Sequence, residues 1–294
     1  MRQRVISAVI FVVAMLGGVF GGATAFYILF ALITAGCLWE FNGLLFSQEN
    51  NHLMFRKVVG TILGLLPFLV FGSKIFNLFL PLPSGVEFKP YLFVAELSDN
   101  ISPILMSVIL LLLLVFVLFI VELFLQSDKP FTNIGHYIVG VIYLGVPFSL
   151  LISISYWHDN YAPFRVFGLL FLNWTNDTMA YAIGSQIGKT PFFSRISPNK
   201  TWEGTIGGMV CTFIVAYIFS FILTDFALKE WLVQAAMVAI FGTIGDLVES
   251  MFKRSIHVKD SGSILPGHGG FLDRFDSFIF ALPFVWLGLM LLEG

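Results

Sequence analysis

The segment from Lys253 to Asp276 holds residue types that bind phosphate groups and divalent metal ions. Its 24 residues include four cations and a Pro-Gly-His-Gly-Gly turn. Lys and Arg side chains bind phosphate oxygens, and glycine allows the backbone to approach a ligand closely. Asp273 and Asp276 offer the hard oxygen ligands that Mg²⁺ prefers, and this ion usually arrives with the phosphates of a substrate. We therefore expect a site for a metal and a polyphosphate rather than an ordinary solvated loop.

A second basic segment, from Ser194 to Gly204, has residues that are typical of a helix start. Ser197-Pro198 and Thr201 suit a first turn, where free N–H groups and the positive end of the helix dipole attract anions. Lys200 adds a positive charge. The segment is a second candidate for phosphate binding.

A run that resembles a nucleotide-binding P-loop, Gly184 to Thr190, precedes this segment. Three residues separate Gly184 from Gly188, whereas the P-loop requires four. The run also follows an expected membrane helix and not a strand. We therefore exclude a P-loop triphosphatase.

Asp177 is the single charge in the apolar stretch from Val166 to Gly188. An ionised carboxylate near the middle of a bilayer costs several kcal/mol unless it is paired or faces water. Asn173 and Asn176 extend its polar stripe. We favour a functional role, and the alternative is an interhelical hydrogen bond that only holds the bundle together.

Asp246 follows a second uncharged stretch, Trp231 to Gly245. At helical spacing, Asp246, Glu249, Ser250 and Lys253 fall on one face. Glu249 and Lys253 alone can be explained as an ion pair one turn apart. That pair does not explain Asp246, so we expect a polar track leading into the bundle.

The composition indicates whether these residues lie in a water-soluble or a membrane protein. Of 294 residues, 57% are hydrophobic and only 12% are charged, and the mean hydropathy is +0.90. So few charges cannot cover a water-soluble surface, so we predict an all-α integral membrane protein. The net charge of −2 speaks against a nucleic-acid partner, which would require a basic surface. Cys37 and Cys211 lie in apolar runs and suggest no disulfide.

Apolar runs of about 20 residues predict nine membrane-spanning helices. Val5 to Trp39 is too long for one crossing, and the glycines at 17, 18, 21 and 22 predict a helical hairpin there. A cleaved signal peptide ending at Ala23-Thr24-Ala25 is a less favoured interpretation. The remaining spans are Val58 to Leu80, Ile101 to Val121, Asn133 to Ser155, Val166 to Gly188, Ile206 to Thr224, Trp231 to Phe252 and Asp276 to Leu292.

The distribution of Lys and Arg predicts the orientation. Of the 16 such residues, a cytoplasmic N-terminus leaves only Lys74, Lys89, Arg165 and Lys229 in outer segments. An odd number of spans then places the C-terminus outside. We divide the chain into N-terminal helices (1–165) and a C-terminal catalytic region (166–294) whose basic loops, 188–201 and 253–275, face the cytoplasm. The short N-terminal segment favours a bacterial cytoplasmic membrane.

The basic segment and the helix before it contain one long motif: Ser250-x-x-Lys253-Arg254, Lys259-Asp260-x-Gly262 and Leu265-Pro266-x-His268-Gly269-Gly270-x-x-Asp273-Arg274-x-Asp276. This motif resembles the signature of the phosphatidate cytidylyltransferases (CDP-diacylglycerol synthases). The Ser197 to Gly204 segment and the Asn176-Asp177 pair look like further marks of that family. The resemblance covers Val166 to Asp276, whereas the N-terminal half matches only in hydrophobicity and span layout.

The resemblance implies transfer of the cytidylyl group of CTP to phosphatidic acid, giving CDP-diacylglycerol and pyrophosphate, in a multi-span membrane protein that forms homodimers. It implies that Asp246 and Asp273 hold catalytic Mg²⁺, which Mn²⁺ can replace, with K⁺ as a candidate second ion. The cations that would hold the triphosphate and the lipid phosphate, undivided between the two, are Lys200, Lys253, Arg254, Lys259 and Arg274. The other implied site residues are Asp177, Ser197, Glu203, Ser250, Asp260, His268, Gly269, Gly270 and Asp276.

This chemistry agrees with the residue types. A phosphatidate oxygen is already an anion and can attack in line, so Ser250 and His268 suit positioning or phosphate contact better than a catalytic dyad. A polar track from Asp177 and Asp246 would give a lipid headgroup a lateral entrance.

Three alternative functions predict other features. A cation-coupled transporter would have midplane acids without the dense phosphate-binding cluster. A CDP-alcohol phosphotransferase would carry an Asp-Gly-x-x-Ala-Arg run, which this sequence lacks. A non-catalytic membrane scaffold would give no reason for Asp177 and Asp246.

Overall fold

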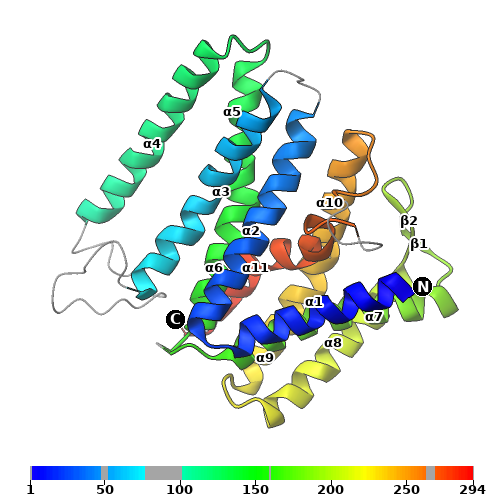
Figure 1. The fold of residues 1–294 in the computed structure, drawn as a ribbon. Helices are drawn as coiled ribbons and strands as arrows, with labels where there is room; N and C mark the ends of the chain where they lie inside the picture. Colours follow the sequence, from blue (N-terminus) through cyan, green and yellow to red (C-terminus); the bar gives the residue numbers. More distant parts are fainter. Residues whose placement is uncertain (1, 48–51, 77–100, 159, 263–268, 294) are drawn as a thin grey trace.

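Long apolar segments with few helix-breaking residues make the chain almost entirely helical (Figure 1). The computed structural model describes residues 2–47, 52–76, 101–158, 160–262 and 269–293. The helices are α1 (Arg2–Phe20), α2 (Ala23–Phe46), α3 (Leu53–Phe76), α4 (Ile101–Phe124), α5 (Pro130–Gly140), α6 (Val146–Ser155), α7 (Pro163–Ile187), α8 (Trp202–Ile222), α9 (Leu228–Met237), α10 (Thr243–Ser255) and α11 (Leu272–Glu293). A two-stranded antiparallel sheet, β1 (Pro191–Phe193) and β2 (Ser197–Thr201), lies between α7 and α8.

The expected spans coincide with helices, except that residues 77–80 lie outside the described part of the chain. Among the described residues, six helical segments are long and apolar enough to cross a membrane: Ala23–Phe46, Leu53–Gly72, Pro130–Ser155, Trp202–Ile222, Leu228–Ser255 and Leu272–Glu293. An all-helical membrane protein is therefore confirmed. The number of nine crossings, the side of each terminus and the two-part division stay predictions.

The first two helices are separated at the predicted glycines. Gly22 has φ +95°, a conformation that glycine adopts without strain, and α2 begins at the next residue. Figure 1 shows α1 lying across the bundle, over α7, and not alongside α2. The break is thus where the sequence places it, but the two helices do not form a parallel-sided hairpin.

Two membrane segments each contain a π-helical turn. η3 (Val141–Gly145) joins α5 to α6, and η4 (Val238–Gly242) joins α9 to α10. A π turn inserts a residue into the helical repeat and changes the face on which the following residues lie. Because η4 directly precedes α10, it helps to set the direction in which Asp246 projects.

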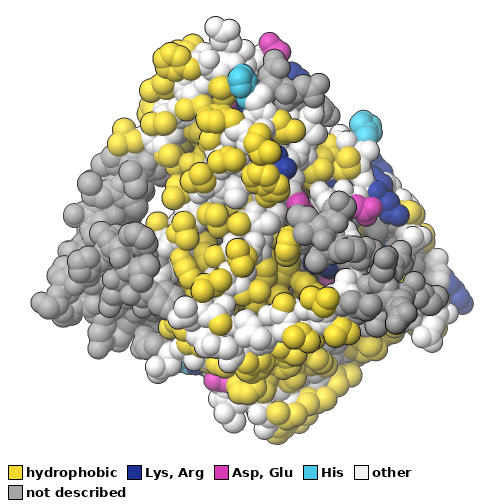
Figure 2. All heavy atoms as spheres, in the orientation of Figure 1, with side chains coloured by type: hydrophobic (Ala, Val, Ile, Leu, Met, Phe, Trp, Pro, Cys, Tyr) yellow, Lys and Arg dark blue, Asp and Glu magenta, His cyan; other side chains and the backbone are white. Residues whose placement is uncertain are grey.

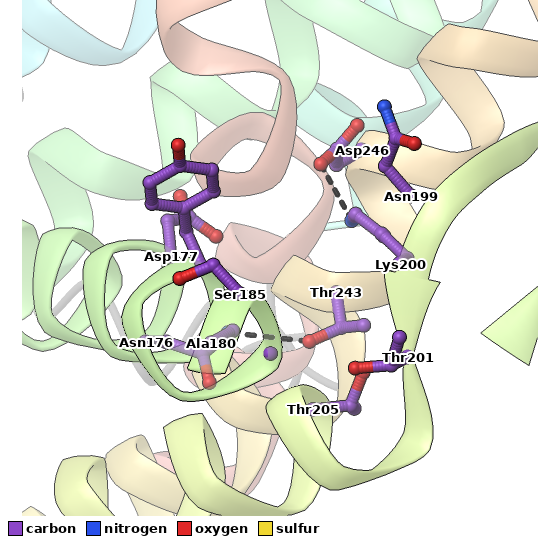
Figure 3. A pocket seen from close by; sticks show the side chains of 12 residues that line it. Asn176, Asp177, Ala180, Ser185, Asn199, Lys200, Thr201, Thr205, Thr243 and Asp246 are labelled. Carbon is purple, nitrogen blue, oxygen red and sulfur yellow. Dashed lines mark hydrogen bonds and ion pairs between the residues drawn. The ribbon is translucent and has the colours of Figure 1, made fainter. Parts of the chain in front are cut away.

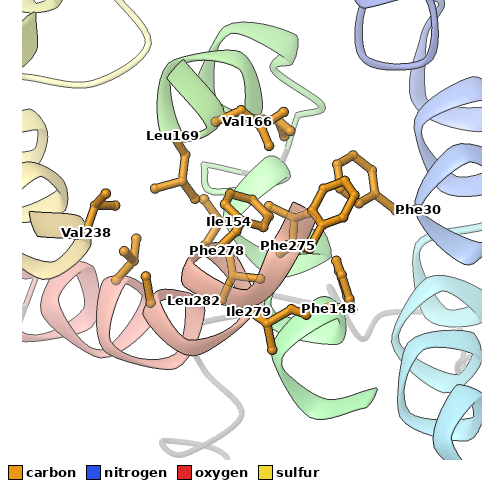
Figure 4. Close-up of a cluster of buried hydrophobic side chains, with 14 of the residues drawn as sticks. Phe30, Phe148, Ile154, Val166, Leu169, Val238, Phe275, Phe278, Ile279 and Leu282 are labelled. Atoms are coloured by element: carbon orange, nitrogen blue, oxygen red, sulfur yellow. The ribbon is translucent and has the colours of Figure 1, made fainter. Parts of the chain in front are cut away.

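The buried core combines residues from both halves of the sequence. Phe275, Phe278 and Leu282 of α11 pack among Phe30 of α2 and Phe148 of α6 (Figure 4). Because lipid chains are as apolar as these side chains, such helices associate through close packing more than through the hydrophobic effect. Figure 2 shows that apolar side chains also cover much of one outer face, with few charges among them, as a lipid-facing surface requires.

Small residues bring α7 and α8 into close contact. A Cβ atom added at Gly204 would lie 2.6 Å from the Ala180 carbonyl oxygen, and one at Gly208 would lie 2.7 Å from that of Asn176. Glycines four residues apart commonly allow the backbones of two membrane helices to approach in this way. The contact fixes α8 against the part of α7 that carries Asn176 and Asp177.

We expect Gly208→Ala to destabilise the protein by about 1–3 kcal/mol, because the added methyl group must displace the backbone of α7. Thermal denaturation in detergent measures this. Gly135→Ala is the matched control, since a Cβ there meets no atom within 4 Å. Equal denaturation midpoints for the two variants would contradict the packing account.

Candidate functional site

A cavity of about 480 Å³, lined mainly by polar residues, lies between α7, α8, β2 and α10 (Figure 3). Asp177, Lys200 and Asp246, which the sequence analysis selected from three separate segments, all line it. The other lining residues are Asn176, Ala180, Tyr181, Gly184, Ser185, Asn199, Thr201, Thr205 and Thr243.

Lys200 and Asp246 form an ion pair in this cavity. Lys200 Nζ lies 2.5 Å from Asp246 Oδ2, and Ser250 Oγ donates to Asp246 Oδ1 over 3.3 Å. The side chains of Lys200 and Asp246 are 24% and 31% exposed. Both side chains border the cavity. A phosphate bound there can therefore pair with Lys200, and a metal ion can bind Asp246.

Asp177 projects from the middle of α7 toward α10 and α11. It accepts a hydrogen bond of 3.4 Å from Asn173 Nδ2 and one of 3.5 Å from Ser277 Oγ. Asn176 instead donates to Thr243 Oγ1 over 3.2 Å and connects α7 to α10. Interhelical hydrogen bonds, the alternative role that the sequence offered, are therefore present. Asn176 bonds to Thr243 of α10, whereas Asp177 both bonds to Ser277 of α11 and lines the cavity.

A second cavity, of about 420 Å³, adjoins the first at Asp177. Its lining includes Ala8, Phe11 and Val12 of α1, Trp174 of α7 and the polar start of α11. Its other lining residues are Ser7, Thr178, Asp273, Arg274 and Asp276. This cavity therefore combines apolar helix surface with ionisable groups.

Asp273, in the first turn of α11, lies within a dense group of donors. Its Oδ1 is 2.6 Å from Lys253 Nζ, and its carboxylate accepts the backbone N–H groups of Ser261 (2.9 Å) and Gly270 (2.8 Å). Gly269 has φ +79°, and a Cβ there would lie 2.5 Å from Asp273 Oδ2. The two predicted glycines therefore shape the turn around this carboxylate.

Lys253 joins two helices through its ammonium group. Besides Asp273, it contacts Glu249 Oε2 at 2.8 Å, the ion pair one turn apart that the sequence allowed. Glu249 is fully buried, and Lys253 is 13% exposed. Lys253 therefore makes one contact within α10, to Glu249, and one to the candidate functional residue Asp273.

Four carboxylates gather between α7, α10 and α11. Asp276 interacts electrostatically with Asp246, Glu249 and Asp177. In the described residues, the cations paired with members of this group are Lys200 and Lys253. Carboxylate oxygens are hard donors, the kind of ligand that Mg²⁺ prefers, so the chemistry of this group fits such an ion. The structure places the two predicted metal ligands, Asp246 and Asp273, in separate hydrogen-bonded groups.

The segment before α8 differs in part from the expectation. Ser197 and Pro198 begin strand β2, which pairs with β1, and α8 begins only at Trp202. Thr201 caps this helix by accepting the Gly204 N–H at 3.2 Å. The helix start is therefore at Thr201, as predicted, whereas Ser197 and Pro198 precede it because pairing with β1 holds these two residues extended.

Neither cavity is lined by the predicted residues Glu203, Arg254, Lys259 and Asp260. Glu203 accepts Thr190 Oγ1 (2.8 Å) and the N–H groups of Lys189 and Thr190, so it holds the turn before β1. The side chains of Arg254, Lys259 and Asp260 are exposed at the end of α10 and beyond it. His268 lies outside the described residues.

One acidic residue at this site was missed by the sequence analysis. Glu40, near the end of α2, is 6% exposed and accepts hydrogen bonds from Ser261, Phe271 and Leu272. In the sequence it is only the first charge after a long apolar run, so it resembles an ordinary helix end.

Comparisons with known proteins give a consistent result. The model of the cytidylyltransferase family matches residues 2–292. A phosphatidate cytidylyltransferase of Bacillus subtilis (strain 168) is 35% identical over 292 residues, which cover 99% of this chain and 98% of that protein. Proteins of the same name from Staphylococcus haemolyticus and Staphylococcus aureus (strain COL) are 41% and 39% identical over 57% and 58% of this chain, and over 63% of their own lengths.

Removing Lys253 leaves Glu249 and Asp273 without their shared cation. We expect Lys253→Met to lower the free energy of unfolding by up to about 3 kcal/mol, as for other broken buried pairs. Lys259→Met, which removes an exposed cation from the same segment, is the control and should change it by less than about 0.5 kcal/mol. Similar losses in both variants, measured by denaturation in detergent, would contradict the bridging role.

Proposed function

The chain belongs to the cytidylyltransferase family, and we propose that it transfers the cytidylyl group of CTP to phosphatidic acid, giving CDP-diacylglycerol and pyrophosphate. The observation that carries this proposal is the near full-length similarity to a phosphatidate cytidylyltransferase, together with a cavity lined mainly by polar and charged residues inside an apolar helical bundle. Family membership makes the protein a nucleotidyltransferase, so the transporter and scaffold hypotheses are wrong.

The reaction requires no covalent intermediate on the enzyme. An oxygen of the lipid phosphate forms a bond to the α-phosphorus of CTP, and the bond from that phosphorus to the bridging oxygen of pyrophosphate breaks. Negative charge moves from the attacking oxygen to the leaving group. Two anionic reactants must be brought together, so positive charge and positioning are the main requirements.

We assign one substrate to each cavity. The cavity of Lys200 is lined by amides and hydroxyls such as Asn176, Asn199 and Thr205, which suit a nucleotide and its phosphates. The cavity beside α1 joins Arg274 to the apolar side chains of Phe11 and Trp174, a combination that suits a phosphate attached to acyl chains. Asp177 lines both, so the reacting groups would meet beside it, and the second cavity would be the lateral entrance for the headgroup.

Asp246, with Asp273 as the second predicted ligand, would hold Mg²⁺. When bound, this ion supplies positive charge to the triphosphate oxygens and the leaving pyrophosphate. Lys200 would then exchange Asp246 for a phosphate oxygen, and Lys253 would hold Asp273 in place. Replacement by Mn²⁺ and a second K⁺ ion stay predictions.

The similar proteins are bacterial, and the described helices support a multi-pass membrane protein. We place it in the cytoplasmic membrane, with the basic segments 188–201 and 253–275 facing cytoplasmic CTP. We also propose that the protein forms a homodimer and has no nucleic-acid partner.

The direct assay uses purified protein in detergent. Pyrophosphate release should require CTP, phosphatidic acid and Mg²⁺ together, and Asp246→Asn should lower kcat by at least about 100-fold because it weakens charge stabilisation at the reacting phosphates. Asp128→Asn, an exposed acid before α5, is the control and should retain full activity. Asp273→Asn tests the second predicted ligand in the same assay. Release without phosphatidic acid, or equal rates for Asp246→Asn and the control, would overturn the proposal.

The substrate assignment predicts opposite effects of two cation variants. Lys200→Met should raise the KM for CTP by about tenfold with less effect on phosphatidic acid, and Arg274→Met should do the reverse, because each loses about one charge-assisted hydrogen bond. Steady-state kinetics with each substrate varied in turn measure this. The opposite pattern would contradict the assignment and would place CTP in the cavity beside α1 and phosphatidic acid in the cavity of Lys200.

A further inference from the structure

Glu40 connects the N-terminal half of the chain to the loop that carries the predicted catalytic groups. Its Oε1 accepts the Phe271 N–H (3.0 Å), and its Oε2 accepts the Leu272 N–H (3.0 Å) and Ser261 Oγ (2.9 Å). The first N–H groups of a helix have no partner within the helix, and a carboxylate there is also favoured by the helix dipole. Glu40 is therefore the acceptor for the start of α11.

The contacts of Glu40 lie beside those of Asp273. Ser261 donates its hydroxyl to Glu40 and its backbone N–H to Asp273. On the other side, Gly270 donates to Asp273, while the next two residues donate to Glu40. Two carboxylates from α2 and α11 thus hold the same two short stretches of backbone.

This arrangement gives a physical reason for two glycines of the signature. A Cβ at Gly262 would lie 2.6 Å from Glu40 Oε1, and a Cβ at Gly270 would collide with Glu40 Oε2 and Ser261 Oγ. Any side chain at either position would displace the carboxylate. These glycines make room for a residue that is more than 200 positions earlier in the sequence.

The carboxylates of Asp273 and Glu40 differ in their access to a ligand. Asp273 accepts from Lys253, Ser261 and Gly270, so a ligand that it binds competes with these donors. Glu40 is buried and lines neither of the two cavities described above.

We propose that Glu40 is a positioning residue of the active site: it fixes Ser261 and the start of α11 against α2, so that Asp273 keeps its place when its own donors are exchanged. This inference rests on the proposed function. It gives α2, in addition to α1, a part in the catalytic site.

The test compares Glu40→Gln with Glu122→Gln. Glu122 is also a buried carboxylate, but it binds Arg56 (2.7 Å) and Asn133 (3.0 Å), away from both cavities. We expect Glu40→Gln to lower kcat by about 10- to 100-fold, the usual effect of losing a residue that orients a ligand group, with a smaller change in the KM for CTP. Trypsin cleavage after Lys259 should also become about tenfold faster, because Ser261 loses its anchor. Glu122→Gln should change neither kcat nor the rate of trypsin cleavage, once both are corrected for the fraction of folded protein. Thermal denaturation measures that fraction.

A second variant tests the geometry without changing Glu40. Gly262→Ala should reproduce the loss of kcat and the faster cleavage, and combining it with Glu40→Ala should add no further loss, since the truncated side chain can no longer be displaced. Additive losses, unchanged cleavage in Glu40→Gln, or equal effects of Glu40→Gln and Glu122→Gln would overturn the inference. A wild-type protein without cytidylyltransferase activity would refute the proposed function, whereas the cleavage rates would still decide the anchoring by Glu40.

Discussion

Carboxylates inside an apolar helical bundle need partners, and this requirement connects most of the features of the site. An ionised acid that faces only hydrocarbon is costly, so each must meet a cation, a set of N–H groups or water. Glu122 meets Arg56, Asp273 meets Lys253 and two backbone N–H groups, and Glu40 meets the start of α11. The polar contacts between helices are largely the solutions to this problem.

The acids beside the cavities differ from these residues because they lie close to one another. Asp177, Asp246, Glu249 and Asp276 influence one another, and Lys200 and Lys253 pair with Asp246 and Glu249. A purely structural network would have no reason to gather four acids, because like charges at close range oppose folding. A site that binds a divalent ion together with a triphosphate would have such a reason.

Much of the site could be predicted because charged residues stand out in an apolar chain. Asp177, Lys200 and Asp246 were selected by residue type and spacing, and the structure brings them to one cavity. Glu40 could not be found in this way, since it resembles a helix end and its partners follow more than 200 residues later. The strand at Ser197 was missed because its extended form depends on pairing with β1, and the direction of α1 depends on packing that no local pattern encodes.

The central proposal is that a divalent ion compensates the carboxylates gathered at this site. The most direct measurement is the thermal denaturation midpoint of the wild type and of Asp276→Asn, each with and without Mg²⁺. The account predicts that Mg²⁺ raises the wild-type midpoint, and that Asp276→Asn is more stable than the wild type without Mg²⁺ but gains less from it. A variant that is less stable without the ion, and that gains as much from Mg²⁺ as the wild type does, would contradict it.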